Sequence, residues 1–259
     1  MPDDMNHNSD TQRIAVYPDT LAASSKFEQW KTDSGNGAYR FSFMTVFAVL
    51  ILLLYSGSNL AVSDPTAWLK DLNQGMVIFV LVTTVVSQWI IFFIMFAAAY
   101  RERTGLYGLG FKRLRFFDLI LGLVLFAAAA ATMAGLARVM ELLGYPLPGE
   151  IAMLIPKDAF GRVVWVFVSL TAGICEEALF RGYLMTRLRI LLKSDSWFWP
   201  LIISSVIFGA AHGYQGPHGM ILLSVYGIIL GSIFIYTKSL WPVIVVHALQ
   251  DLLALFIPQ

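Results

Sequence analysis

Long apolar runs limit the folds open to this chain more than any other feature of its sequence. Most of the runs are about 20 residues or longer, the length that a helix needs to cross the hydrocarbon core of a bilayer. They cover residues 41–62, 76–100, 116–140, 162–190, 199–212, 218–236 and 241–257. Because lipid offers no partner to backbone polar groups, each run should form a helix. The sequence therefore predicts an all-α, polytopic transmembrane helix bundle of about seven spans.

The amino-acid composition is also typical of a membrane protein. Hydrophobic residues make up 58% of the chain and charged residues 14%, whereas soluble domains are about half apolar and a quarter charged. The net charge of +1 gives no bulk attraction to nucleic acid, so we expect lipid as a partner and no nucleic acid. Cys175 is the single cysteine, which excludes an internal disulfide.

Charge in the connecting segments predicts the orientation. Residues 1–40 are polar and lack the apolar core of a signal peptide, so we expect a poorly ordered cytosolic tail there. Lys and Arg are concentrated in the loop 101–115 and around the end of the fourth run, where Arg187 and Arg189 are counted with Lys193 in the following loop. The segments 63–75 and 141–161 hold one lysine each. The rule that positive loops stay inside then places the N-terminus in the cytosol.

Ionisable side chains inside the apolar runs are few, and such residues are functional candidates by default. The informative ones are Glu176, Glu177 and Arg181 in the fourth run, His212 at the end of the fifth, and His247 with Asp251 in the seventh. His218, by contrast, is expected in a solvated loop. Gly227 and Gly231 have the spacing of a small-residue helix contact.

Helical spacing places Glu176 and Glu177 on different faces of their helix. Adjacent positions are rotated by about 100°, while residues four apart share a face. Glu177 is therefore expected to pair with Arg181, which leaves Glu176 free for chemistry. The alternative is that both glutamates join one packing network with Arg181.

The two membrane histidines could each be packing residues on their own. His247 and Asp251 are four apart, so the carboxylate can hold the imidazole in one orientation, an arrangement that is also common in structural roles. By helical rise, Glu176 and His212 both lie about 20–25 Å from the cytosolic ends of their runs. We therefore predict that Glu176, His212 and His247 meet within about 8 Å, as water activation requires groups near hydrogen-bond reach.

Three motifs together resemble a known family. Glu176-Glu177-x-x-x-Arg181, Phe208-x-x-x-His212 and His247-x-x-x-Asp251 follow one another on successive apolar runs. This set is similar to the CPBP family of CAAX proteases, bacteriocin-processing enzymes and abortive-infection proteins, which includes the type II CAAX prenyl endopeptidases. The resemblance covers about residues 105–257. We therefore divide the chain into a tail (1–40), two N-terminal transmembrane helices (41–104) and a protease core (105–259).

The resemblance implies an intramembrane endopeptidase acting on a membrane-embedded, prenylated or leader-peptide substrate, and it points to a bacterial inner membrane. It implies that Glu176 and His212 activate water and that His247 stabilises the oxyanion. Prenyl endopeptidases typically have Asn at the position of Asp251. An ionised carboxylate cannot donate to an oxyanion, so Asp251 must either be protonated or orient His247.

A cofactor is not required by these residues. Two histidines and a glutamate form a plausible zinc set, and the family is often labelled metalloprotease. The same groups can also activate water without an ion, which is the interpretation we favour.

Two other functions stay open on the sequence alone. One is a catalytically idle scaffold or immunity protein of this fold, and the other is a proton-coupled transporter using the same residues as a relay.

Overall fold

The computed structural model describes residues 47, 49–54, 64, 66–102, 104–192 and 195–256. The predicted tail 1–40 lies outside the described residues, as does most of the first apolar run, which is helical at 47 and 49–54. All regular elements within the described part are helices. In chain order they are η1 (Ala67–Asp71), α3 (Gln74–Arg101), α4 (Gly105–Gly108), α5 (Phe116–Leu142), η2 (Gly149–Leu154), α6 (Ala159–Glu177), η3 (Ala178–Met185), α7 (Thr186–Leu191), α8 (Phe198–Ala211), η4 (Gly213–Gln215), α9 (Gly216–Thr237), α10 (Leu240–Leu253) and η5 (Ala254–Phe256).

Among the described residues, four helical segments are long and apolar enough to cross a membrane. They are Gln74–Arg101, Phe116–Leu142, Ala159–Leu191 and Gly213–Thr237, and two shorter apolar helices cover Phe198–Ala211 and Leu240–Phe256. Their length and apolar surface follow directly from the runs in the sequence. The predicted all-α polytopic bundle is confirmed, and the protein is an integral membrane protein.

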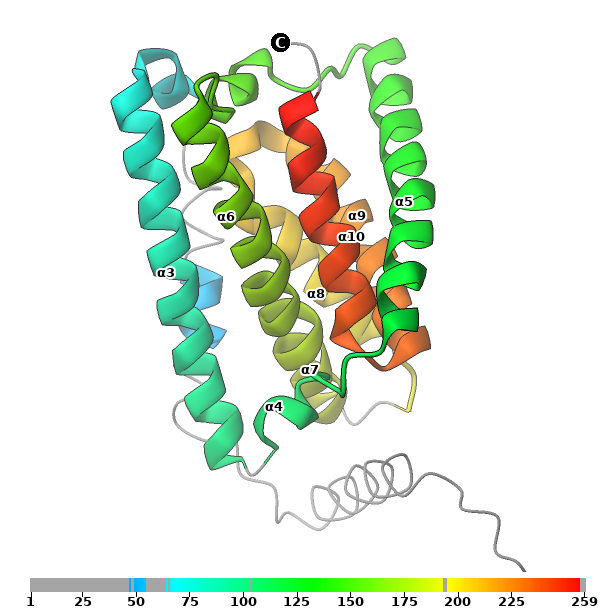
Figure 1. The fold of residues 1–259 in the computed structure, drawn as a ribbon. Coiled ribbons are helices and arrows are strands. Elements are labelled where there is room, and N and C mark those ends of the chain that lie inside the picture. Colours follow the sequence, from blue (N-terminus) through cyan, green and yellow to red (C-terminus); the bar gives the residue numbers. More distant parts are fainter. Residues whose placement is uncertain are drawn as a thin grey trace, which may run out of the picture. The chain divides into compact units, whose positions relative to one another are not determined.

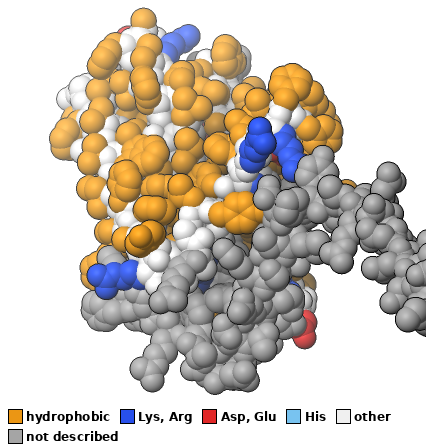
Figure 2. All heavy atoms as spheres, turned by 60° about the horizontal axis from the view of Figure 1, so that its bottom comes forward, with side chains coloured by type: hydrophobic (Ala, Val, Ile, Leu, Met, Phe, Trp, Pro, Cys, Tyr) orange, Lys and Arg blue, Asp and Glu red, His pale blue; other side chains and the backbone are white. Residues whose placement is uncertain are grey.

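The helices form two layers. In Figure 1, α3, α6, α10 and α5 lie side by side, and α8 and α9 pack together behind α6 and α10. The outer helices α3 and α5 expose large apolar side chains, such as Phe79 at 69% and Phe116 at 77%. Figure 2, turned so that the lower end of Figure 1 comes forward, shows hydrophobic side chains over much of the described surface, with Lys and Arg side chains in a few places. A surface of this kind suits lipid contact, because lipid tails do not penalise exposed apolar groups.

Glycines set the close approach of α8 and α9. A Cβ at Gly209 would lie 2.1 Å from Oγ of Ser224, and one at Gly227 would lie 3.0 Å from Cα of Ser205. At Gly231 the added Cβ would reach within 2.3 Å of a Leu201 methyl. The predicted packing role of Gly227 and Gly231 is therefore confirmed.

The fourth span is continuous but changes its winding. The α-helix α6 passes at Ala178 into a π-helix, η3, in which every residue is buried. A π-helix weakens the regular hydrogen-bond ladder, and Oγ of Ser204 on α8 donates to the carbonyl of Phe180 over 2.9 Å. Gly182 is needed here, since a Cβ would lie 2.4 Å from the Leu109 carbonyl oxygen.

Two expectations about charged or polar loops are wrong. Arg187 does not lie in a loop: it is 5% exposed on α7 and forms a 2.6 Å ion pair with Glu102, because the helix continues past η3 and brings Arg187 against the end of α3. His218 lies in the first turn of α9, half-buried, where its Nδ1 donates to the Pro146 carbonyl over 3.0 Å. Its ring also packs on Tyr145.

Candidate active site

Three helices bring one carboxylate and two imidazoles together inside the bundle. Glu176 comes from the last turn of α6, His212 caps the end of α8, and His247 lies in the middle of α10. Oε2 of Glu176 is 3.8 Å from Nε2 of His212 and 4.0 Å from Nε2 of His247. The predicted meeting of these side chains within about 8 Å is confirmed.

Each histidine is held through its other ring nitrogen. Nδ1 of His212 lies 2.8 Å from the Phe208 carbonyl, and Nδ1 of His247 lies 2.6 Å from Oε1 of Glu177. Both partners only accept hydrogen bonds, so Nδ1 is the donor in each ring. When neutral, both imidazoles therefore present an unprotonated Nε2 toward Glu176.

Glu177 and Arg181 form the predicted pair at a fully buried position. Nη1 of Arg181 donates to Oε1 of Glu177 over 2.6 Å, and the side chains are 2% and 0% exposed. The second guanidinium nitrogen, Nη2, donates to the Gly227 carbonyl on α9 over 3.3 Å. Glu177 thus does more than pair with Arg181, because the same Oε1 also accepts from His247.

Of the two roles left open for Asp251, orienting His247 through a hydrogen bond is not supported by the geometry. Oδ2 of Asp251 is 3.7 Å from Nε2 of His247, which is too long for a hydrogen bond, and its side chain is 32% exposed. The orienting carboxylate is Glu177, which holds the opposite nitrogen. Positions four apart do share a helix face, but the imidazole turns Nδ1 across to α6, so only Nε2 faces Asp251.

Phe208 packs against both histidines of the cluster. Its ring centroid is 4.8 Å from that of His212 and 6.0 Å from that of His247. On another side, the guanidinium carbon of Arg181 lies 4.4 Å from the same ring, within range of a cation–π contact. The aromatic residue of the second motif therefore fixes the spacing between the imidazoles and the buried ion pair.

Part of the chain that holds this cluster matches a known protein family. Residues 158–253 match the family model described as type II CAAX prenyl endopeptidase Rce1-like. The chain carries an Rce1-like domain. The domain contains all six residues singled out from the motifs, and this family is a protease family. The searches of curated proteins and of solved structures gave no match.

The positions of Glu176, His212 and His247 do not match a tetrahedral zinc centre. Within the described part of the chain, no group of three His, Cys, Asp or Glu side chains is arranged to hold a metal ion. The donors of Glu176, His212 and His247 are 3.8 and 4.0 Å apart, somewhat wider than ligands about 2.0–2.1 Å from one tetrahedral zinc would be. We therefore derive no catalytic step through a metal.

One contact to the site comes from outside the Rce1-like domain, and sequence reasoning missed it. Nε2 of Gln88, on α3, donates to Oε1 of Glu176 over 2.6 Å. A signal was present in the sequence: Gln88 is the one amide or charged residue in the apolar run 76–100. Polar residues at such depth are expected to face the bundle interior.

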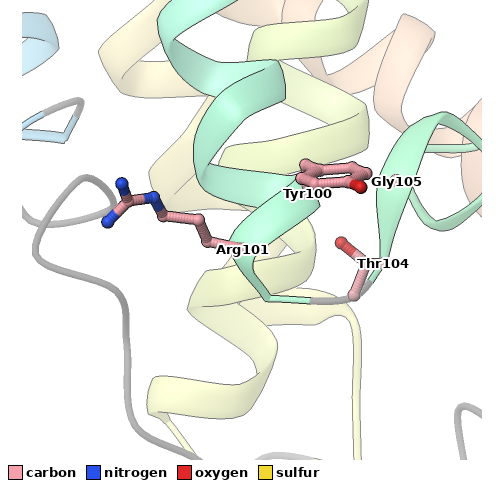
Figure 3. A pocket seen from close by; sticks show the side chains of 4 residues that line it. All are labelled: Tyr100, Arg101, Thr104 and Gly105. Atoms are coloured by element: carbon pink, nitrogen blue, oxygen red, sulfur yellow. The ribbon is translucent and has the colours of Figure 1, made fainter.

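A pocket of about 520 Å³ lies away from this cluster, at the end of α3. Tyr100, Arg101, Thr104 and Gly105 line it, and Figure 3 shows the Arg101 side chain directed away from Tyr100 and Thr104. Arg101 follows Gln88 by about 20 Å of helical rise. This pocket is therefore separate from the carboxylate and imidazoles of the Rce1-like domain.

Proposed function

We propose that the protein is an intramembrane endopeptidase in which Glu176 and two histidines activate water to cleave a peptide bond. One observation carries the proposal. Oε2 of Glu176 is buried, has no hydrogen-bond partner within the described residues, and faces the two imidazole Nε2 atoms. Separations of 3.8 and 4.0 Å are too long for direct hydrogen bonds but suit a polar atom lying between the groups.

In the proposed reaction Glu176 is the general base. A water bonded to its Oε2, and within reach of His212 Nε2, gives its proton to the carboxylate as the water oxygen attacks the substrate carbonyl carbon. The carbon–oxygen double bond opens to an oxyanion. Glu176 then returns the proton to the leaving amide nitrogen, the carbon–nitrogen bond breaks, and a carboxylic acid and an amine are released.

His247 is proposed to stabilise the oxyanion. To donate from Nε2 it must carry a proton on each ring nitrogen, and the 2.6 Å contact with Glu177 stabilises the positive charge of that form. Donors already held in place at a developing charge are among the largest contributors to catalysis. Because Glu177 already orients the imidazole, we assign Asp251 the remaining role of a second donor when its carboxyl is protonated.

The substrate is proposed to be a membrane-associated peptide: a prenylated protein terminus, a leader peptide or a membrane protein segment. We also propose that no cofactor is required, that the N-terminus is cytosolic, and that the protein resides in a bacterial inner membrane. The orientation rests on the Lys and Arg of 101–115, compared with one lysine in each of 63–75 and 141–161.

The decisive experiment compares wild type with Glu176→Gln in detergent, using prenylated CAAX-type and leader-type peptides with fluorescent reporters. The amide keeps the shape of the side chain but cannot take a proton, so turnover should fall about a hundredfold or more while peptide binding persists. Glu141→Gln serves as the control, since Glu141 pairs with Arg138 on the exposed surface of α5. Equal turnover in wild type and Glu176→Gln would refute the proposal.

Chelation tests the cofactor part separately. EDTA and 1,10-phenanthroline should leave turnover unchanged if protein groups alone activate the water. Loss of turnover that added zinc restores would instead assign the water's activation to a metal. Binding without cleavage across all peptide classes would favour a non-catalytic scaffold.

A further inference from the structure

Glu176, the proposed general base, accepts a hydrogen bond from a helix outside the Rce1-like domain. The family match begins at residue 158, whereas Gln88 belongs to α3, which packs along α6. Its amide Nε2 donates to Oε1 of Glu176 over 2.6 Å, a short contact typical of a bond to an ionised acceptor.

This contact places the two carboxylate oxygens of Glu176 in different surroundings. Oε1 is occupied by Gln88, and Oε2 is left toward His212 and His247. The terminal torsion of a glutamate is soft, so an unanchored carboxylate can rotate. Rotation would move Oε2 from the position in which it faces both Nε2 atoms, where the attacking water is proposed to bind.

The side chain of Gln88 is hard to explain by packing alone. Its own Oε1 is buried and has no hydrogen-bond partner within the described residues, which costs free energy in an apolar setting. A leucine or methionine would fill the same space between α3 and α6 without that cost. The amide is therefore better understood as serving the carboxylate it contacts.

We propose that Gln88 is a positioning residue that fixes the Glu176 carboxylate for catalysis, so that α3 completes the active site of the Rce1-like domain. The inference rests on the proposed function, because it assigns Gln88 to the same base. It predicts an effect on turnover rather than on substrate binding, since Gln88 acts on the base and not on the peptide.

The chain offers a matched control on the same two helices. Nε2 of Gln74, at the start of α3, contacts Oδ2 of Asp158, the residue that caps α6. Gln74 and Gln88 are separated by about 21 Å of helical rise. Both glutamines thus link α3 to the α6 region through a carboxylate, but only Gln88 reaches the cluster.

The experiment measures kcat, KM and melting temperature for Gln88→Met and Gln74→Met. Gln88→Met should lower kcat about tenfold to a hundredfold, the range for losing a hydrogen bond to a charged group, with KM changed less than about twofold. Gln74→Met should leave kcat unchanged. Gln88→Glu keeps the length but replaces the donor by a second carboxylate, so it should be at least as inactive as Gln88→Met.

The outcomes separate the two proposals. Wild-type kcat in Gln88→Met, with Glu176→Gln inactive, overturns the role of Gln88 and leaves the protease proposal standing. Activity in Glu176→Gln overturns the protease proposal itself. If Gln88→Met does not fold, Gln88→Asn keeps an amide that is one methylene too short for the contact. A loss of kcat there supports positioning, and full activity overturns it.

Discussion

Glu177 and His247 are joined by a 2.6 Å hydrogen bond between Oε1 and Nδ1 across helices α6 and α10. Both side chains are almost fully buried, and the same Oε1 accepts from Arg181. The negative charge of Glu177 is thus shared between a guanidinium and an imidazole. The arrangement ties the buried ion pair to the group proposed to stabilise the oxyanion.

Removing Arg181 should damage both folding and activity. In Arg181→Ala the buried Glu177 loses the guanidinium that contacts it at 2.6 Å. Breaking one side of a buried ion pair typically costs about 3–5 kcal/mol. We expect a lower folded yield and a lower melting temperature, measured in detergent, together with reduced turnover. If yield and melting temperature stay at wild-type values while turnover vanishes, Arg181 belongs to the chemistry itself.

Asp251→Asn should be tolerated, because Glu177 and not Asp251 orients the ring of His247. The amide of asparagine is always a donor, whereas the carboxyl donates only when protonated. Turnover at neutral pH should therefore stay within a few fold of wild type or rise, while Asp251→Ala, which has no donor, should be slower. A loss in Asp251→Asn as deep as that of Glu176→Gln would show that the carboxylate itself is needed.

The sequence predicted the parts of the site that depend on spacing along a helix. The apolar runs identified the spans, and the interval of four residues identified the Glu177–Arg181 pair. Contacts between helices were harder to predict, because spacing does not say which face meets which neighbour. The bond from Gln88 to Glu176 and the choice of Glu177 over Asp251 as the partner of His247 Nδ1 both depend on such lateral packing.

Arg187 illustrates the same limit in a different way. The apolar run 162–190 already includes it, but its charge favoured a loop position; the helix continues through η3 and α7 and buries the guanidinium. Periodicity of 3.6 residues does not predict a π-helical turn, which depends on partners such as Ser204 and on the space at Gly182. Residues 1–40 and their predicted cytosolic tail lie outside the described residues.

The buried pair of Arg187 and Glu102 should matter far more than an exposed pair of the same length. Nη2 of Arg187 is 2.6 Å from Oε2 of Glu102, with side chains 5% and 1% exposed. Arg138 and Glu141 are 2.7 Å apart but 62% and 57% exposed. Arg187→Met should lower the free energy of unfolding by about 3–5 kcal/mol, and Arg138→Met by at most about 1 kcal/mol.

Melting curves of both variants in one detergent provide the comparison. Similar melting temperatures for the two variants would show that the buried pair adds no more to stability than the exposed one.

Gly209→Ala should separate α8 from α9 and disturb His212, three residues further along. The added Cβ would lie 2.1 Å from Oγ of Ser224 and 2.4 Å from the Met220 carbonyl oxygen. Because a backbone atom cannot move aside cheaply, overpacking of this kind costs about 1–3 kcal/mol. Gly135→Ala on α5 is the control, since its Cβ would meet nothing within 4 Å and alanine is the better helix former. We expect Gly209→Ala to lower both melting temperature and kcat, while Gly135→Ala leaves kcat unchanged and melting temperature equal or higher. Unchanged kcat in a destabilised Gly209→Ala would mean that the contact between α8 and α9 supports the fold without setting the position of His212.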